Sequence, residues 1–112
     1  SDTFVEFAGP LMEKLDRPTL FCNTLSVNGD GAITDYVLRQ QDGKKKVALA
    51  LKSLNYQVIA VGDSYNDITM LQASDHAILY RPPDNVKAEY QDFPVAVNYE
   101  ELKERLLAIM KP

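Results

Sequence analysis

The fold of this chain is decided by one ten-residue stretch, VIAVGDSYND, which runs from Val58 to Asp67. Its first four residues form a short continuous apolar run, which is typical of a strand buried in a parallel sheet. The run stops at Gly62, and helical spacing of apolar residues begins soon afterwards. The strand therefore delivers Asp63 at its carboxyl end, where open α/β sheets place their ligand sites.

Two carboxylates in this stretch, Asp63 and Asp67, stand four residues apart. On a helix face such like charges repel by a few tenths of a kcal/mol, and a cation or a set of donors would remove that cost. Mg²⁺ prefers a few carboxylate oxygens together with waters and phosphate oxygens, and Asn66 adds an amide. A plain helix cap by Asp63 or Ser64 remains the alternative. A calcium loop is excluded, because its pattern needs other residue types at the third and sixth positions.

Around this stretch, helical and strand-like apolar patterns alternate, which predicts an α/β fold. Two β-prone runs flank the turn Asn28-Gly29-Asp30-Gly31, so a β-hairpin with a loop of about four residues is expected near residues 19–38. Further strands are expected at 77–80 and 95–97, with a loop at 81–85 between them. Cys22 falls in the first run of the hairpin and is interpreted as a small core residue.

Three longer amphipathic helices are also predicted. The first follows Ser1, Asp2 and Thr3, which are all good N-cap residues, and Gly9-Pro10 predicts a kink or two short helices there. The second follows Gly43 with one buried apolar face, and the third closes the chain. The apolar residues at helical spacing are Phe4, Phe7, Leu11, Met12 and Leu15, then Val47, Leu51 and Leu54, then Leu102, Leu106 and Ile109.

Composition excludes several classes of protein. The 112 residues allow one domain, and a net charge of −4 argues against nucleic acid as a partner. No apolar run approaches the roughly 20 residues of a membrane span, and the first stretch lacks the basic start of a signal peptide, so we expect a cytoplasmic protein. One cysteine excludes an internal disulfide, and no Cys/His cluster suggests zinc. No acidic or nucleophilic residue flanks His76 at a spacing that indicates catalysis, so it is interpreted as structural or exposed.

Two other segments fit an anionic ligand. Ser1 at a helix start offers a hydroxyl beside free backbone N–H groups, a natural phosphate cradle, although taken alone a plain N-cap is the better reading. Lys44-Lys45-Lys46 begins the second helix, where cations oppose the helix dipole by roughly 0.3–1 kcal/mol each. A solvated face explains two of these lysines, and an anion would explain a third.

In this order, a hydroxyl, a lysine and a strand-end aspartate pair, the features resemble the second, third and fourth motifs of the haloacid dehalogenase-like (HAD) phosphatases. The similarity covers the whole chain and is closest to the bacterial bifunctional phosphoserine phosphatase/homoserine phosphotransferase group. Ordinary phosphoserine phosphatases resemble it less, because glycines typically stand where this chain has Asp2-Thr3. The segments that carry the resemblance are 1–4, 10–12, 38–40, 52–54 and 62–67.

The resemblance implies a role for each matching residue. Asp63 would ligate Mg²⁺. Asp67 would not be a ligand itself but would support the residues that bind the metal. Ser1 would bind the transferring phosphate through its hydroxyl, with Asp2 contributing to the substrate site. Asn66 would contact the substrate. The fold implied is a Rossmann-type parallel sheet core, of which residues 1–112 would be the C-terminal part.

The family's lysine, which neutralises phosphate charge, is assigned to Lys44. The apolar residues of the following helix then fall three, four, seven and ten positions later. That spacing places Lys44 ahead of the buried face, pointing toward the carboxyl end of the sheet. Lys45 is the second candidate for the same role.

The mechanism that the resemblance implies is phosphoryl transfer through an aspartyl-phosphate. One aspartate attacks phosphorus, and a second, two residues later, protonates the leaving oxygen and then activates water. No two aspartates of this chain are separated by a single residue. The nucleophile, the general acid and the family's helical cap are therefore expected outside these residues, and the chain alone is predicted to be inactive.

In this family the strand of the first motif lies beside the strand of the fourth. Without it, Val58–Val61 would have no partner on one side, leaving backbone groups buried without hydrogen bonds or exposed as a sticky edge. We therefore expect that the chain does not fold alone as the family core, and that its main partner is the missing N-terminal half of the same protein. A homodimer is also considered.

The leading functional hypothesis is a Mg²⁺-dependent phosphomonoesterase acting on phosphoserine, with phosphate transfer to homoserine as a second reaction. One alternative is a HAD phosphatase for another small phosphorylated metabolite. The other is a non-catalytic domain that binds Mg²⁺ or phosphate. An Asp-x-Asp or Asp-x-Glu pair upstream of Ser1 would favour an enzyme, and its absence would favour the binding domain.

Overall fold

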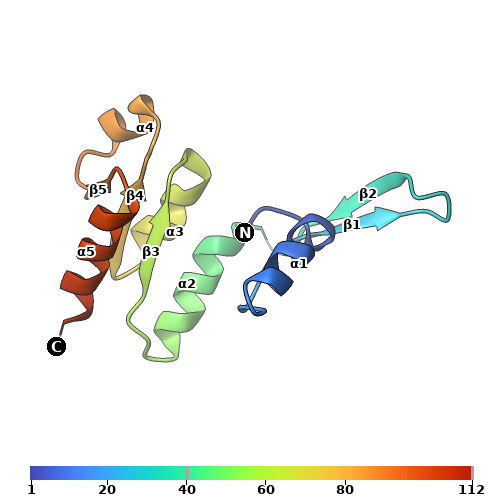
Figure 1. Cartoon of the computed structure of the whole chain (residues 1–112), viewed down its shortest axis with the longest axis horizontal. Coiled ribbons are helices and arrows are strands. Elements are labelled where there is room, and N and C mark those ends of the chain that lie inside the picture. The colour runs from blue at the N-terminus through green and yellow to red at the C-terminus, as the bar shows by residue number, and fades with distance from the viewer. Residues whose placement is uncertain (40, 112) are drawn as a thin grey trace. The chain divides into compact units, whose positions relative to one another are not determined.

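The computed structural model describes residues 1–39 and 41–111 of the chain. Gln40, which ends the resembling segment 38–40, lies outside the described residues. The chain divides into two compact units, Ser1–Gly43 and Lys44–Pro112 (Figure 1). Helices and strands alternate as predicted, so the α/β class is confirmed. That residues 1–112 form part of one larger core stays a prediction.

The first unit contains helix α1 (Val5–Lys14) and an antiparallel hairpin of strands β1 (Thr24–Val27) and β2 (Ile33–Val37). The hairpin predicted near residues 19–38 is therefore confirmed. Its loop covers residues 28–32, one residue longer than expected. The Asn28 side chain shapes this loop, because its Oδ1 accepts hydrogen bonds from the N–H groups of Asp30 and Ala32, each at 3.0 Å.

The start of α1 differs from the prediction. Phe4 is the N-cap residue, because the residues before the helix pair with Asn23 instead of capping. The Asn23 N–H donates to the Thr3 carbonyl at 3.0 Å, and the Val5 N–H donates to the Asn23 carbonyl at 2.9 Å. The N-cap prediction for residues 1–3 is therefore wrong, since this short pairing holds them away from the helix start.

Two further expectations for the first unit are corrected. The structure has one helix running through Pro10, so of the two alternatives predicted there the pair of short helices is wrong, and the kink stays a prediction. Pro10 lies on the exposed surface, where the carbonyl that loses its helical partner can be hydrated. Cys22 lies outside β1 and is only half-buried, because the strand begins at Thr24.

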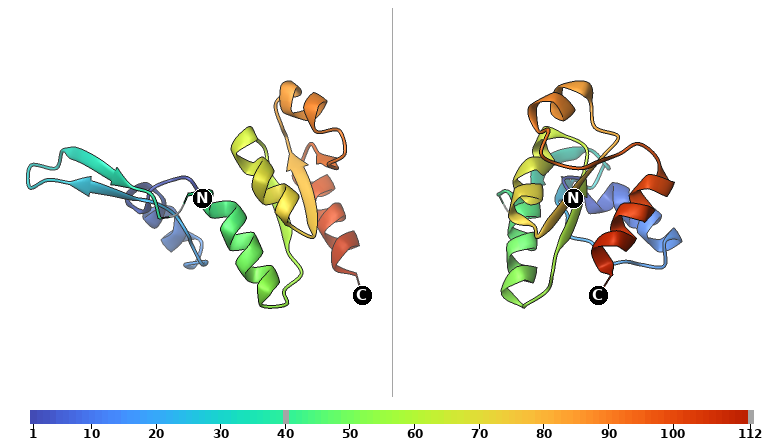
Figure 2. Two further views of the ribbon diagram at one scale, coloured as in Figure 1. Left: turned by 180° about the vertical axis from the view of Figure 1, so that it is seen from behind. Right: turned by 90° about the vertical axis from the view of Figure 1, so that its left-hand side faces the viewer.

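The second unit is built on a parallel sheet in the order β3 (Ile59–Gly62), β4 (His76–Tyr80) and β5 (Val95–Ala96). All three strands fall where the apolar runs predicted them. Helices α2 (Gly43–Ser53) and α3 (Ile68–Ala73) lie on one face of the sheet, and α5 (Tyr99–Met110) lies on the other (Figure 2). This is the layered arrangement that buries parallel strands on both sides.

The core of the second unit lies on both faces of β4. Leu79 and Ile78, neighbours on β4 that point to opposite faces, are each 0% exposed. The cluster between the sheet and the helices α3 and α4 (Asp84–Glu89) consists of Ala60, Ile68, Leu71, Leu79 and Val86. This packing fixes the position of β3 and of the turn that follows it.

Two predictions for the second unit are wrong in part. The loop expected at 81–85 gives way to α4 from Asp84, because Pro83 accepts the first helical hydrogen bond and Val86 is buried against the core. The buried face expected on α2 is small. Ala48 is 3% exposed, whereas Leu54 is 67% exposed, since α2 covers only the margin of a three-stranded sheet.

One edge of the sheet is open. Within the described residues β3 pairs with β4 alone, and Val61 on β3 is 37% exposed. The expectation that this strand lacks a neighbour on one side agrees with the observed strand order. In the described part of the chain no helix is long and apolar enough to cross a membrane.

Candidate active site

The candidate site lies where β3 ends and the chain turns sharply into α3. A single 3₁₀ turn, η1 (Tyr65–Asp67), joins the two elements. Asp67 is 6% exposed as a whole residue, and its carboxylate accepts hydrogen bonds from the N–H donors of this turn. These donors are the N–H groups of Asp63 at 3.0 Å and Ser64 at 3.2 Å. One buried carboxylate therefore holds the whole turn in shape.

Gly62 is required at the end of β3 because Asp67 packs against it. A Cβ atom at Gly62 would lie 2.6 Å from the Asp67 Cβ and 2.8 Å from its Oδ2. Real Cβ atoms essentially never approach other atoms so closely. The glycine and the aspartate of the motif are thus a matched pair, in which a missing side chain makes room for a buried one.

Lys44 forms an ion pair with the buried aspartate of the turn. Its Nζ lies 2.6 Å from Asp67 Oδ1, an ion pair between side chains that are 20% and 8% exposed. Of the two lysines considered for the phosphate role, Lys44 is the one that this contact places at the turn. Burial raises the pKa of Asp67, but the Lys44 ammonium and the N–H donors of Asp63 and Ser64 outweigh it and hold that pKa below its ordinary value.

Asp63 has the opposite environment. The residue is exposed at the carboxyl end of β3, and within residues 1–39 and 41–111 its carboxylate has no hydrogen-bond or ion-pair partner. Those residues also hold no cluster of three or more metal-ligating side chains. The two aspartates of the motif therefore differ in their environment. The Asp67 carboxylate is occupied by contacts within the protein, whereas the Asp63 carboxylate is accessible to a ligand.

Asn66 and Ser64 lie on the exposed side of the same turn. The Ser64 hydroxyl is hydrogen-bonded to the Asn66 side-chain oxygen, and it also lies 3.2 Å from Asp67 Oδ2. Asn66 is exposed, as is Asp63 at the start of the same turn. The structure thus brings four of the predicted site residues together, namely Lys44, Asp63, Asn66 and Asp67.

Ser1 and Asp2 belong to the first unit. Both are exposed, and the Ser1 hydroxyl accepts a hydrogen bond from the Thr3 N–H at 3.2 Å. The Asp2 carbonyl accepts one from the Asn23 side chain at 3.3 Å. Their part in phosphate binding stays a prediction.

Sequence reasoning missed one contact of the turn. The Tyr65 hydroxyl donates a hydrogen bond to Glu89 Oε2 at 2.6 Å, which links η1 to the last residue of α4. This hydrogen bond raises the pKa of Tyr65 above its ordinary value. The two residues are 24 positions apart and α4 was not predicted, so no local pattern indicated the pair.

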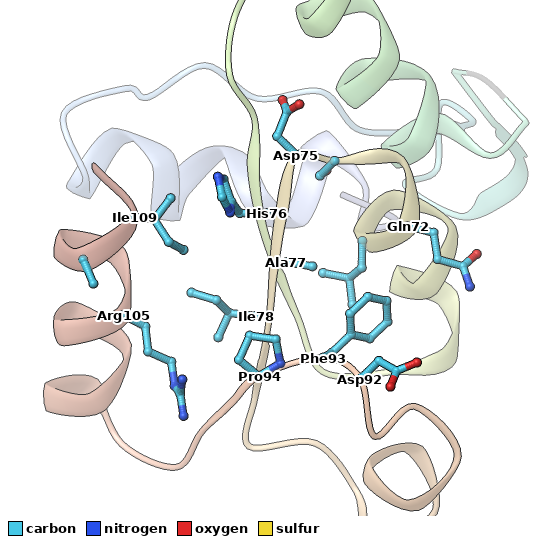
Figure 3. A pocket seen from close by; sticks show the side chains of 13 residues that line it. Gln72, Asp75, His76, Ala77, Ile78, Asp92, Phe93, Pro94, Arg105 and Ile109 are labelled. Atoms are coloured by element: carbon cyan, nitrogen blue, oxygen red, sulfur yellow. The ribbon is translucent and has the colours of Figure 1, made fainter. Parts of the chain in front are cut away.

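A groove of about 500 Å³ lies elsewhere in the second unit, at the amino end of β4 (Figure 3). Ile78 and Pro94 form part of its apolar lining, with Arg105 and Ile109 of α5 on one side. The groove contains none of the six predicted site residues. Because Asp63 stands at the carboxyl end of the sheet, the groove lies at the opposite end from the candidate site.

Comparisons with known proteins bear on this site. A family model described as haloacid dehalogenase-like hydrolase matches residues 24–88. Phosphoserine phosphatase ThrH of Pseudomonas aeruginosa is 48% identical over 107 residues, which is 96% of this chain and 52% of the relative. A phosphoserine phosphatase of Pseudomonas syringae pv. tomato is also 48% identical, over 96% of this chain and 45% of that protein. The chain spans about half the length of the curated relatives that it matches.

Solved structures give the same picture of the fold. A substrate-bound phosphoserine phosphatase complex superposes with a TM-score of 0.71 at 23% identity, covering 96% of this chain and 52% of that one. A probable phosphoserine phosphatase from Vibrio cholerae superposes with a TM-score of 0.66 at 26% identity, over 86% of this chain and 31% of that one.

Proposed function

The chain belongs to the haloacid dehalogenase-like hydrolase family, and we propose that it carries most of the catalytic site of a Mg²⁺-dependent phosphoserine phosphatase. The single observation that carries this proposal is the arrangement at the end of β3. A lysine and a buried aspartate are paired at 2.6 Å beside the exposed carboxylate of Asp63. The names of the 48% identical relatives support phosphoserine as the substrate.

The residues of the turn fit a magnesium ion in part. Mg²⁺ in phosphoryl-transfer sites is commonly held by one or two carboxylates, with waters and substrate phosphates as its other ligands. The free carboxylate of Asp63 suits such a ligand, whereas Asp67 already accepts hydrogen bonds from two N–H groups and pairs with Lys44. In our proposal Asp63 binds the metal. Asp67 holds Asp63 in position by accepting a hydrogen bond from the Asp63 backbone N–H. When bound, Mg²⁺ would neutralise charge on the transferring phosphoryl group.

The other residues have distinct tasks in this proposal. Lys44 supplies positive charge near the phosphoryl oxygens, and its pairing with Asp67 keeps the ammonium in place before substrate arrives. Asn66 contacts the substrate from the exposed face of η1. Ser1 binds the phosphate through its hydroxyl, and Asp2 contributes to the substrate site. Phosphate transfer to homoserine is part of the proposal as a second reaction of the same site.

The attacking aspartate and the general acid are supplied, in this proposal, by a segment outside these 112 residues. Two observations support this. The chain holds no Asp-x-Asp, and β3 has an open edge within the described residues, where a further parallel strand would bring its carboxyl end next to Asp63. The partner proposed is therefore the N-terminal half of the same protein.

The test is phosphate release from phosphoserine by the intact protein, with and without Mg²⁺. Wild type is expected to be active only with the metal. Asp63→Asn is expected to lose at least a hundredfold in kcat/KM, because a charge that stabilises the transition state is worth that much. Asp92→Asn, which changes an exposed carboxylate away from the turn, is the control. Unchanged activity in Asp63→Asn would falsify the metal assignment.

A further inference from the structure

Tyr65 is anchored to α4 by two separate contacts. Its hydroxyl donates to Glu89 Oε2 at 2.6 Å, and its ring meets the Tyr90 ring edge-on, with centroids 6.2 Å apart. Tyr90 in turn stacks on Phe93, and both of these rings pack against the core cluster of the second unit. The side chain of an exposed turn residue is thus tied to the interior through a neighbouring helix.

These contacts give the turn a second point of attachment. At one end, Asp67 is held by Lys44 and by the backbone of the turn itself. At the other end, Tyr65 is held by Glu89. Asn66 stands between the two anchored residues. Because each residue has only two soft backbone dihedrals, fixing both neighbours leaves its backbone little freedom to change direction.

We infer that Tyr65 is a positioning residue, whose hydrogen bond to Glu89 holds Asn66 in the orientation in which it contacts the phosphorylated substrate. This inference rests on the proposed function, in which Asn66 contacts that substrate. It assigns to Tyr65 and Glu89 a role that acts through Asn66 and touches no reacting atom. It also makes α4, which follows the end of β4, a support for the site at the end of β3.

Phosphoserine hydrolysis by the intact protein tests the inference through the division between KM and kcat. Tyr65→Phe removes the hydroxyl and keeps the ring. We expect KM to rise about fivefold, the scale of one lost hydrogen bond to a charged acceptor at a partly exposed site, with kcat within twofold of wild type. A change that only lowers stability would reduce the active fraction, and so kcat, at constant KM. That pattern would overturn the inference.

Glu89 provides the matched variants. Glu89→Ala removes the acceptor and should raise KM as Tyr65→Phe does, whereas Glu89→Gln keeps an acceptor oxygen and should stay near wild type. Tyr56→Phe, a change at a tyrosine that is 63% exposed and outside the turn, is the control. The double variant Tyr65→Phe/Glu89→Ala should be no worse than either single variant, because both remove the same bond. Losses that multiply to about 25-fold would contradict a shared role.

A second measurement separates failure of the inference from failure of the proposed function. If wild type releases no phosphate from phosphoserine, the proposed function fails. The ¹H–¹⁵N spectrum of the intact protein then still tests the coupling. Tyr65→Phe and Glu89→Ala should shift the Asn66 side-chain amide signals, and Tyr56→Phe should not. Unmoved Asn66 signals in both variants would overturn the inference whatever the activity.

Discussion

The two units of this chain bury their side chains to very different extents. In the second unit, Ile78 and Leu79 of β4 are fully buried between helices. In the first unit, every residue of β2 is exposed, and the buried residue among those described is the polar Asn23. A sheet covered on both faces can hold a site at its edge, whereas a two-stranded hairpin alone is marginally stable. The comparison therefore indicates that the buried core of the second unit supports the turn after β3.

The difference also bears on what surrounds the hairpin. Phe7 is 65% exposed, Ile33 60% and Tyr36 59%, although their apolar character suits a covered surface. In the second unit the comparable exposed residues lie on α2, on β3 and on α5. In the function proposed above, the N-terminal half of the same protein covers apolar residues of the hairpin and of the open edge of β3.

The largest expected effect comes from the core of the second unit. Leu79→Ala should lower the free energy of unfolding by about 2–5 kcal/mol, because it leaves a cavity in a fully buried site. Ile33→Ala in the hairpin should change it by less than about 0.5 kcal/mol, as exposed substitutions do. Urea unfolding of the intact protein followed by circular dichroism measures both. Equal effects would show that the two units do not differ as the burial indicates.

A smaller effect is expected at the glycine of the turn. Gly62→Ala places a methyl group against the Asp67 side chain and should cost about 1–3 kcal/mol, as overpacking does. It should also disturb the Lys44–Asp67 pair. Gly29→Ala in the hairpin loop is the matched control, since a Cβ there meets nothing within 4 Å. If both variants unfold at the same urea concentration, the close packing of Gly62 and Asp67 does not contribute to stability.

A loss of similar size that depends on pH is expected at Asp67. Because the pKa of Asp67 lies below its ordinary value of 3.8 in the folded chain, its contribution is complete above that value. The contribution is lost as pH falls from 3.8 through the lower folded value. Asp67→Asn should therefore be less stable than wild type by about 2 kcal/mol near neutral pH, and the gap should narrow below pH 4. The measurement is the urea midpoint of both proteins across the acid range. A difference between wild type and Asp67→Asn that stays constant down to low pH would contradict this account.

Much of the fold follows from residue patterns. The run Val58–Val61, the hairpin turn and the closing helix each carry a local signal, and each element appears close to its predicted place. The prediction failed where long-range pairing decided the outcome. Asp2 and Thr3 are hydrogen-bonded to Asn23 and do not cap α1, and α4 forms because Val86 finds a buried position.

The candidate site also combines features that residue patterns predict with features that only long-range packing determines. The spacing of the motif predicts Asp63, Asn66 and Asp67 on one turn, and helical periodicity favours Lys44 over Lys45, which agrees with the ion pair between Lys44 and Asp67. Neither pattern could show that Asp67 is buried and committed while Asp63 is open, because that contrast depends on packing against Gly62. The link from Tyr65 to Glu89 joins elements distant in the chain, and only the folded structure displays it.

The central claim is that the site is built around the lysine that pairs with Asp67. Steady-state phosphate release from phosphoserine by Lys44→Met and Lys45→Met variants of the intact protein tests it most directly. The account predicts that Lys44→Met loses at least a hundredfold in kcat/KM, as loss of a charge that stabilises the transition state does. It predicts that Lys45→Met stays within about threefold of wild type, as a solvated lysine on the same helix should. Full activity in Lys44→Met, or the larger loss in Lys45→Met, would contradict it.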